Sequence, residues 1–92
     1  MNWKTTKLKQ FAKVLLSMEN EKDMLNLLRD VCTLEELDVL SSRWQAVKMI
    51  EKGLSYREIA SKTGLSTTTV TRVAHWLNNG EGGYEKALKL NK

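Results

Sequence analysis

The chain has 92 residues, of which 41% are hydrophobic and 28% are charged, a balance typical of a globular protein and not of a disordered one. No apolar run is long enough for a membrane span, and no short apolar segment follows a basic start, so we expect neither a membrane anchor nor a signal peptide. Cys32 is the only cysteine, which excludes an internal disulfide and favours a reducing compartment, the cytoplasm.

The formal net charge is +4, and the positive charge is unevenly distributed. Residues 1–18 contain four lysines and no acidic residue, and residues 55–77 contain three basic residues against one acidic residue. Residues 19–52, in contrast, are acidic overall. This distribution fits a protein that binds the phosphates of DNA, and it also fits solvated lysines that have no partner.

Two amphipathic helices are predicted near the start of the chain, from Trp3 to about Glu19 and over Glu21–Cys32. Neither stretch contains proline or glycine, and apolar residues recur in both at helical spacing. The apolar stripe of each helix is broad, so each helix needs packing partners on more than one side.

A third helix is predicted to run from Thr33 to Lys52, and Gly53 ends it. Thr33 precedes Glu36 by three residues, which lets the two residues satisfy free backbone N–H groups reciprocally in a capping box. The first two helices, with their broad stripes, carry more apolar surface than so short a chain can cover. We therefore predict that residues 1–52 are the dimerisation helices of a homodimer, in a single domain over residues 1–92.

The stretch 55–78 is predicted to be a helix-turn-helix. Ser55 and Glu58 can form a second capping box at the start of its first helix, and Gly64 can end this helix in a left-handed conformation. Ser66 can cap the second helix. The inward positions are apolar, as two crossing helices require: Ile59, Ala60, Leu65, Val70, Val73 and Leu77.

The outer side of the second helix is polar. A helical wheel places Thr68, Thr71, Arg72 and His75 opposite the apolar positions. Successive threonines are poor choices for a helix interior, so something other than helix stability favours them. Their short hydroxyl and methyl groups let a helix lie deep in the major groove, where they can contact phosphates, base edges and thymine methyls.

Plainer explanations remain open for several of these features. The helical pair also fits an ordinary hairpin of an all-α domain. Arg72 either contacts DNA, holds an acidic ligand or phosphate, or pairs at the surface with Glu58 or solvent. His75 is either a phosphate or base contact or simply exposed. Arg43, in the middle of the third helix, is either a ligand-binding residue or one member of an interhelical ion pair.

Residues 78–83, with the sequence NNGEGG, are predicted to be the flexible segment of the chain, and Tyr84–Leu90 is predicted to be a short terminal helix. No stretch alternates as a strand does. The predicted fold class is therefore all-α.

From Thr33 onward, the chain resembles the tryptophan repressor superfamily, and most closely its small members of the YerC/YecD type. The stretches TLEELDVLSSRWQAVKMIEKG and LSYREIASKTGLSTTTVTR carry the resemblance. It implies an intertwined, all-helical homodimer whose reading helices lie about one DNA turn apart, roughly 34 Å, on a palindromic operator. Together, the outer face and the resemblance predict these DNA-binding residues: Arg57, Ser66, Thr67, Thr68, Thr69, Thr71, Arg72 and His75.

The resemblance also implies a pocket for a small effector. In the tryptophan repressor, the bound tryptophan lies between two arginines that correspond to Arg43 and Arg72, and Thr33 corresponds to a backbone contact. The small residues beside that ligand are replaced here by Val73 and Trp76. We expect the Trp76 indole to fill space that a free tryptophan would use, so that the chain does not respond to tryptophan.

No enzymatic chemistry is indicated, because no carboxylate or thiol is spaced to pair with His75 as base or nucleophile. One cysteine and one histidine do not make a metal site, and we expect no cofactor. The predicted function is a sequence-specific DNA-binding regulator, most simply a repressor, that binds as a homodimer. Two alternatives stay open: a protein-interaction module of the transcription machinery, and a tryptophan-dependent repressor.

Overall fold

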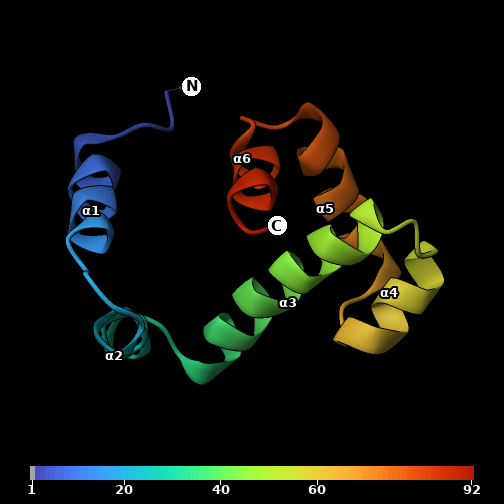
Figure 1. Cartoon of the computed structure of the whole chain (residues 1–92), viewed down its shortest axis with the longest axis horizontal. Coiled ribbons are helices and arrows are strands. Elements are labelled where there is room, and N and C mark those ends of the chain that lie inside the picture. The colour runs from blue at the N-terminus through green and yellow to red at the C-terminus, as the bar shows by residue number, and fades with distance from the viewer. Residues whose placement is uncertain (1) are drawn as a thin grey trace. The chain divides into compact units, whose positions relative to one another are not determined.

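The computed structural model describes residues 2–92, so Met1, the start of the predicted domain, lies outside the described residues. Every regular element of the described chain is a helix, which confirms the predicted all-α class (Figure 1). None of these helices is both long and apolar enough to span a bilayer. The elements are α1 (Thr6–Leu16), α2 (Glu21–Val31), α3 (Leu34–Glu51), α4 (Tyr56–Thr63), α5 (Thr67–Asn79) and α6 (Gly83–Leu90).

Helix α1 is shorter at both ends than the predicted stretch from Trp3 to about Glu19. The Thr5 hydroxyl accepts a hydrogen bond from the backbone N–H of Leu8 at 3.1 Å and so starts the helix. At the other end, the Ser17 hydroxyl donates to the carbonyl of Val14 at 2.6 Å. Short polar side chains compete with the helical backbone in this way, and both helix ends move inward.

The two predicted capping boxes differ in their outcome. At the start of α3, the Thr33 N–H donates to Glu36 Oε1 at 2.8 Å and the Glu36 N–H donates to Thr33 Oγ1 at 3.0 Å, so this box is confirmed. At the start of α4, the Glu58 N–H donates to Ser55 Oγ at 3.1 Å. The Glu58 carboxylate, however, accepts from the Ser55 hydroxyl at 3.2 Å, so only half of the second box forms as predicted.

The described chain divides into two compact units, one up to Leu37 and one from Asp38 to Lys92. In the first unit, α1 and α2 contain no buried residue. The single domain expected over residues 1–92 remains a prediction. In the expected intertwined dimer, a second chain would contribute to the packing of the first unit.

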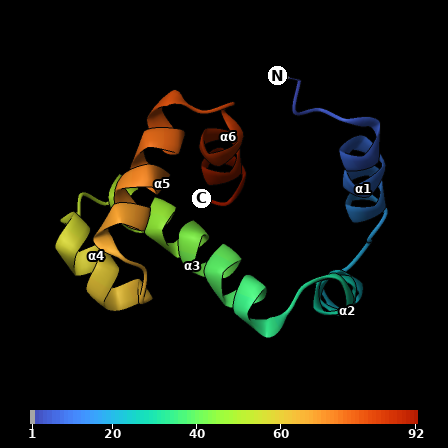
Figure 2. The same cartoon turned by 180° about the vertical axis from the view of Figure 1, so that it is seen from behind.

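The second unit has a core of its own, made where α3, α4 and α5 meet: Ala46, Val47, Ile59, Val70 and Val73. Figures 1 and 2 both show α4 and α5 crossing side by side. The inward positions predicted for this pair are confirmed, since three are buried and Ala60, Leu65 and Leu77 pack partly buried against the core.

The turn between α4 and α5 is held by local hydrogen bonds. Gly64 has φ of +79° and its N–H donates to the carbonyl of Ala60, so it ends α4 in the left-handed conformation predicted from the sequence. The Thr63 hydroxyl donates to the carbonyl of Ile59 at 2.7 Å and accepts from the N–H of Leu65 at 3.2 Å. The crossing of α4 and α5 is therefore fixed by backbone geometry as well as by the core.

Candidate nucleic-acid interface and an adjoining pocket

One side of α5 is buried and the opposite side is exposed. Val70, Val73 and Ala74 are buried, and they anchor the helix to the second unit. The residues predicted for the polar outer face are all exposed: Thr68, Thr71, Arg72 and His75, together with Thr67 and Ser66 at the start of the helix. The polar face is therefore available to a partner and is held on a packed scaffold.

The hydroxyl groups of this face are not equivalent. The hydroxyls of Thr67 and Thr68 have no hydrogen-bond partner within residues 2–92, so both can bond to an incoming molecule. The Thr71 hydroxyl, in contrast, donates to the carbonyl of Thr67 at 2.9 Å, which leaves its methyl group and an acceptor lone pair for a partner. Thr68 is thus the best-placed free donor on the outer face.

The N-terminal cap of α5 uses two of the predicted DNA-binding residues. The Ser66 hydroxyl accepts from the N–H of Thr69 at 3.1 Å and donates to Thr69 Oγ1 at 3.0 Å. Thr69 is only partly exposed, and its side chain lies toward the pocket described below. The DNA contacts expected of Ser66 and Thr69 remain predictions, and the structure gives both hydroxyls a capping role.

Arg72 and His75 lie on this face, and the predicted DNA-binding residue Arg57 lies on α4. Arg57 and Arg72 are exposed, and neither forms an ion pair or hydrogen bond with another residue of the described chain. The surface pairing of Arg72 with Glu58 is therefore not seen. The exposed His75 ring packs edge-on against Trp76, with ring centroids 5.3 Å apart, and its Nδ1 lies 3.5 Å from Asn79 Nδ2.

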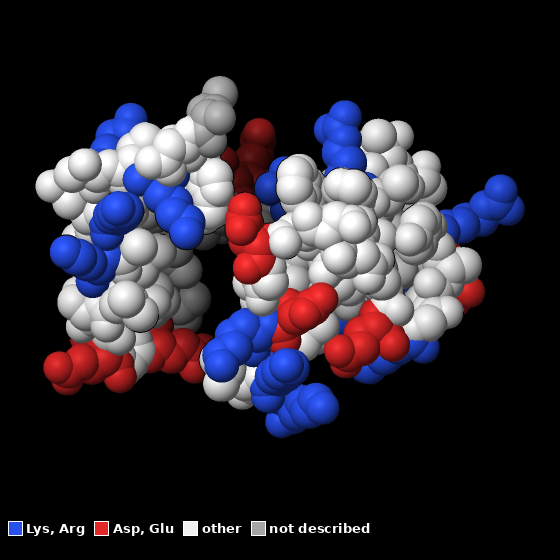
Figure 3. Space-filling model, turned by 90° about the horizontal axis from the view of Figure 1, so that it is seen from above, with Lys and Arg blue, Asp and Glu red and all other residues white. Residues whose placement is uncertain are grey.

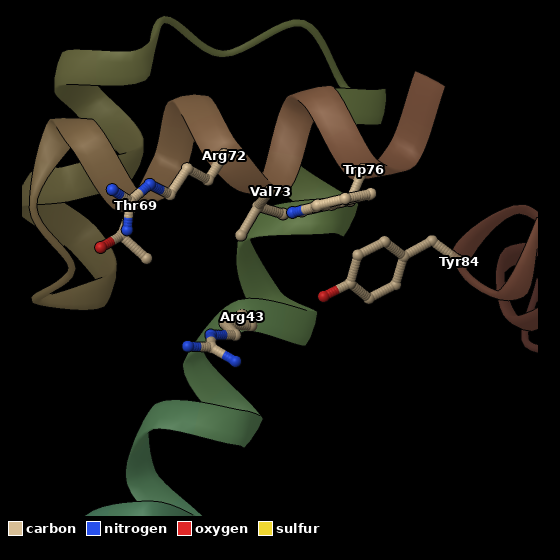
Figure 4. Close-up of a pocket in the computed structure, with 6 residues that line it drawn as sticks. All are labelled: Arg43, Thr69, Arg72, Val73, Trp76 and Tyr84. Atoms are coloured by element: carbon tan, nitrogen blue, oxygen red, sulfur yellow. The ribbon is translucent and has the colours of Figure 1, made fainter. Parts of the chain in front are cut away.

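A pocket of about 280 Å³ lies beside α5, within the second unit. In Figure 4, Arg43 extends from α3 and Tyr84 extends from α6 toward the pocket, and the other lining residues belong to α5. Neither Arg43 nor Arg72 has an ion-pair partner within the described residues, so two guanidinium groups face the pocket unpaired. The lining residues are Arg43, Thr69, Arg72, Val73, Trp76 and Tyr84.

The structure brings together most of the predicted effector residues. Arg43, Arg72 and Trp76 line the same pocket, whereas Thr33 is not among the lining residues and is held in the cap of α3. Trp76 is 58% exposed and lines the pocket, and its expected effect on tryptophan binding remains a prediction. Tyr84 was missed from the sequence because only the packing of α6 against α5 carries it to this place.

Charge is also separated within the first unit. Figure 3 shows basic side chains at one end of this unit and acidic side chains at another. In the sequence of this unit, residues 2–16 contain four lysines and no acidic residue: Lys4, Lys7, Lys9 and Lys13. No group of three or more side chains that could hold a metal ion occurs among the described residues.

Comparison with known proteins agrees with this architecture. The family model described as Trp repressor protein matches residues 6–92. The chain belongs to the Trp repressor family. The uncharacterised protein YerC of Bacillus subtilis (strain 168) is 35% identical over 81 residues, which cover 88% of this chain and 78% of YerC.

Two crystal structures of this family are also similar to the chain. A TrpR-like protein from Eubacterium eligens ATCC 27750 is 36% identical, with a TM-score of 0.88 over 94% of this chain and 89% of that one. A candidate Trp repressor from Staphylococcus aureus is 32% identical, with a TM-score of 0.87 over 94% of this chain and 86% of that one. These matches confirm the resemblance inferred from the sequence and the Trp repressor-like, all-α fold.

Proposed function

We propose that this chain is a sequence-specific DNA-binding regulator of transcription, in which α4 and α5 form a helix-turn-helix and α5 enters the major groove. The exposed polar face of α5 carries the proposal, because Thr67 and Thr68 have free hydroxyls and Arg72 is unpaired within the described chain. Such groups match the acceptors of phosphates and base edges. Membership of a family of regulators favours this role over an enzymatic one.

The proposed regulator acts as a homodimer. Apolar residues of α1 and α2 are exposed in a single chain, Leu16 being 84% exposed and Leu25 56% exposed. A second copy would cover them, and twofold symmetry would present two α5 helices to a palindromic operator. We propose repression as the simplest outcome, since a dimer on an operator blocks access to the DNA beneath it.

Selection of bound DNA from a random pool tests this proposal. We expect the purified protein to enrich one palindromic sequence with half-sites about one helical turn apart. Binding should weaken steeply as the salt concentration rises, because phosphate contacts release counterions. A protein-interaction module would enrich no sequence, and its apolar contacts would be much less sensitive to salt.

The proposed regulator does not respond to tryptophan. Val73 and Trp76 occupy the positions where the tryptophan repressor has small residues, and both line the pocket. We expect calorimetry to show no heat of binding when L-tryptophan is titrated to millimolar concentration. A clear isotherm in the micromolar range would instead establish a tryptophan-dependent repressor, with Arg43 and Arg72 as the residues to substitute next.

A further inference from the structure

We propose that Tyr84, carried on α6, is a built-in wall of the pocket that α5 and α3 also line, and that its ring holds α5 in the orientation that binds DNA without a small-molecule effector. This inference rests on the proposed DNA-binding function. Tyr84 belongs to α6, and the proposed DNA contacts lie on the outer face of α5. In this inference Tyr84 is therefore a positioning residue and not a DNA contact.

The position of Tyr84 carries the inference. Its side chain is half-buried and packs against the core of the second unit. Figure 4 shows the ring pointing from α6 into the space that Val73 and Trp76 border from α5 and Arg43 borders from α3. The ring therefore borders a pocket whose other walls come from both α5 and α3.

The C-terminal half of α5 is less buried than the preceding part of the helix. Its buried residues end at Ala74, and beyond that position Leu77 is only partly buried, while Asn78 and Asn79 are exposed. Tyr84 and Trp76 line the pocket, and they also line a second hollow of about 300 Å³ beside residues 80–83. Removing the ring would enlarge the hollows beside this half of α5 and leave Leu88 as the other α6 side chain packed against the core, and interiors lose contacts when such voids open.

The connection between α5 and α6 determines the position of the Tyr84 ring. The N–H of Gly80 donates to the carbonyl of Trp76 at 2.9 Å, and a Cβ added at Gly80 would collide with that same carbonyl oxygen. The chain therefore leaves α5 in direct contact with the backbone of Trp76. An added Cβ at Gly83, in contrast, would meet no atom within 4 Å, which makes Gly83 a matched control position.

The ring, and not the hydroxyl, performs the proposed role. The Tyr84 hydroxyl has no hydrogen-bond partner within residues 2–92. Tyr84→Phe should therefore keep the function, whereas Tyr84→Ala should leave a hole that a small aromatic molecule can enter, as engineered apolar cavities do.

The test measures the affinity of the full-length protein for its selected DNA at fixed salt. We expect Tyr84→Ala to bind about tenfold more weakly and Tyr84→Phe to stay within about twofold of the wild type. We expect p-cresol, which is the tyrosine side chain as a free molecule, to restore most of the loss in Tyr84→Ala. Unchanged affinity in Tyr84→Ala, or a loss that p-cresol does not restore, would overturn the inference.

A second pair of variants decides the question if Tyr84→Ala does not fold. Gly80→Ala should displace α6 and weaken DNA binding, and Gly83→Ala should bind as the wild type does. Equal affinities of these two variants would overturn the inference. A wild-type protein that binds no DNA would overturn the proposed function itself, which is a different result from variants that bind as well as the wild type.

Discussion

The two units of the chain cover their apolar surface in different ways. From Asp38 onward, three helices share a core in which Ala46, Val47 and Ile59 are fully buried. In α1 and α2, by contrast, no residue is buried, although both helices carry broad apolar stripes. The second unit thus has a packed core that holds α5, and the first unit has an apolar surface that the proposed second copy would cover. In the proposed function, assembly and DNA recognition belong to different parts of a small chain.

The largest effect is expected from a charge placed on the apolar surface of the first unit. Leu25 is 56% exposed in the single chain, and in the proposed dimer the second copy covers it. Leu25→Asp would leave an unpaired charge in an apolar interface and weaken the dimer by about 3–5 kcal/mol. Sedimentation equilibrium and urea unfolding measure this change.

Leu90→Asp is the matched control, because Leu90 is 72% exposed on α6 of the second unit. We expect it to change stability by no more than about 0.5 kcal/mol. If the two variants were equally mild, the surface of the first unit would be solvated in solution, and the contrast between the units would not reflect dimerisation.

A smaller effect is expected among the proposed DNA contacts of the second unit. Arg57→Ala should weaken binding to the selected DNA by about 1–3 kcal/mol and relax specificity at one base pair. The dimer should remain intact, because Arg57 lies on α4 and outside the predicted dimerisation helices of residues 1–52. Competition binding with single-base variants of the site measures both effects.

Lys62→Ala provides the comparison, since Lys62 lies in the last turn of the same helix and its loss removes the same charge. Long-range electrostatics alone would make the two variants equal. A loss confined to Arg57→Ala would indicate a local contact, and equal losses would remove Arg57 from the predicted base-contacting residues.

The two exposed threonines offer a finer test of the same surface. Thr68→Val removes a free hydroxyl and should weaken DNA binding by about 1 kcal/mol, roughly fivefold. Thr71→Val removes a hydroxyl that already bonds to the carbonyl of Thr67 and retains a methyl group, so its effect should be smaller. Quantitative binding assays that rank the two variants the other way would show that Thr71 turns its hydroxyl toward DNA.

Local signals in the sequence explain why α4 and α5 could be predicted in detail. Ser55, Gly64 and Ser66 act on neighbouring backbone groups, and the structure places each of them at the predicted helix end. The ends of α1 were missed because Thr5 and Ser17 act through single hydrogen bonds, without the reciprocal glutamate that marks a capping box.

The pocket was only partly predictable, for a different reason. Arg43, Arg72 and Trp76 were identified through the family resemblance, and they do line one pocket. Tyr84 lies far from Arg43 in the sequence, and no periodicity or spacing relates the two residues. Only the packing of α6 beside α5 brings them together, and such a tertiary contact leaves no local signal in a single sequence.

The smallest effect is expected at Glu36, in the cap of α3 where the first unit ends. Hydrogen bonds from the Thr33 backbone and side chain hold the pKa of Glu36 below its ordinary value. Because this pKa is lowered in the folded state, the cap contributes stability above the ordinary glutamate pKa and loses it as the pH falls through the lowered value. Thermal unfolding of the wild type and Glu36→Gln should therefore differ near neutral pH and converge in acid. Glu35→Gln removes a charge from the same helical turn without breaking the box, so an identical pH dependence in both variants would attribute the effect to the helix dipole and not to the bond with Thr33.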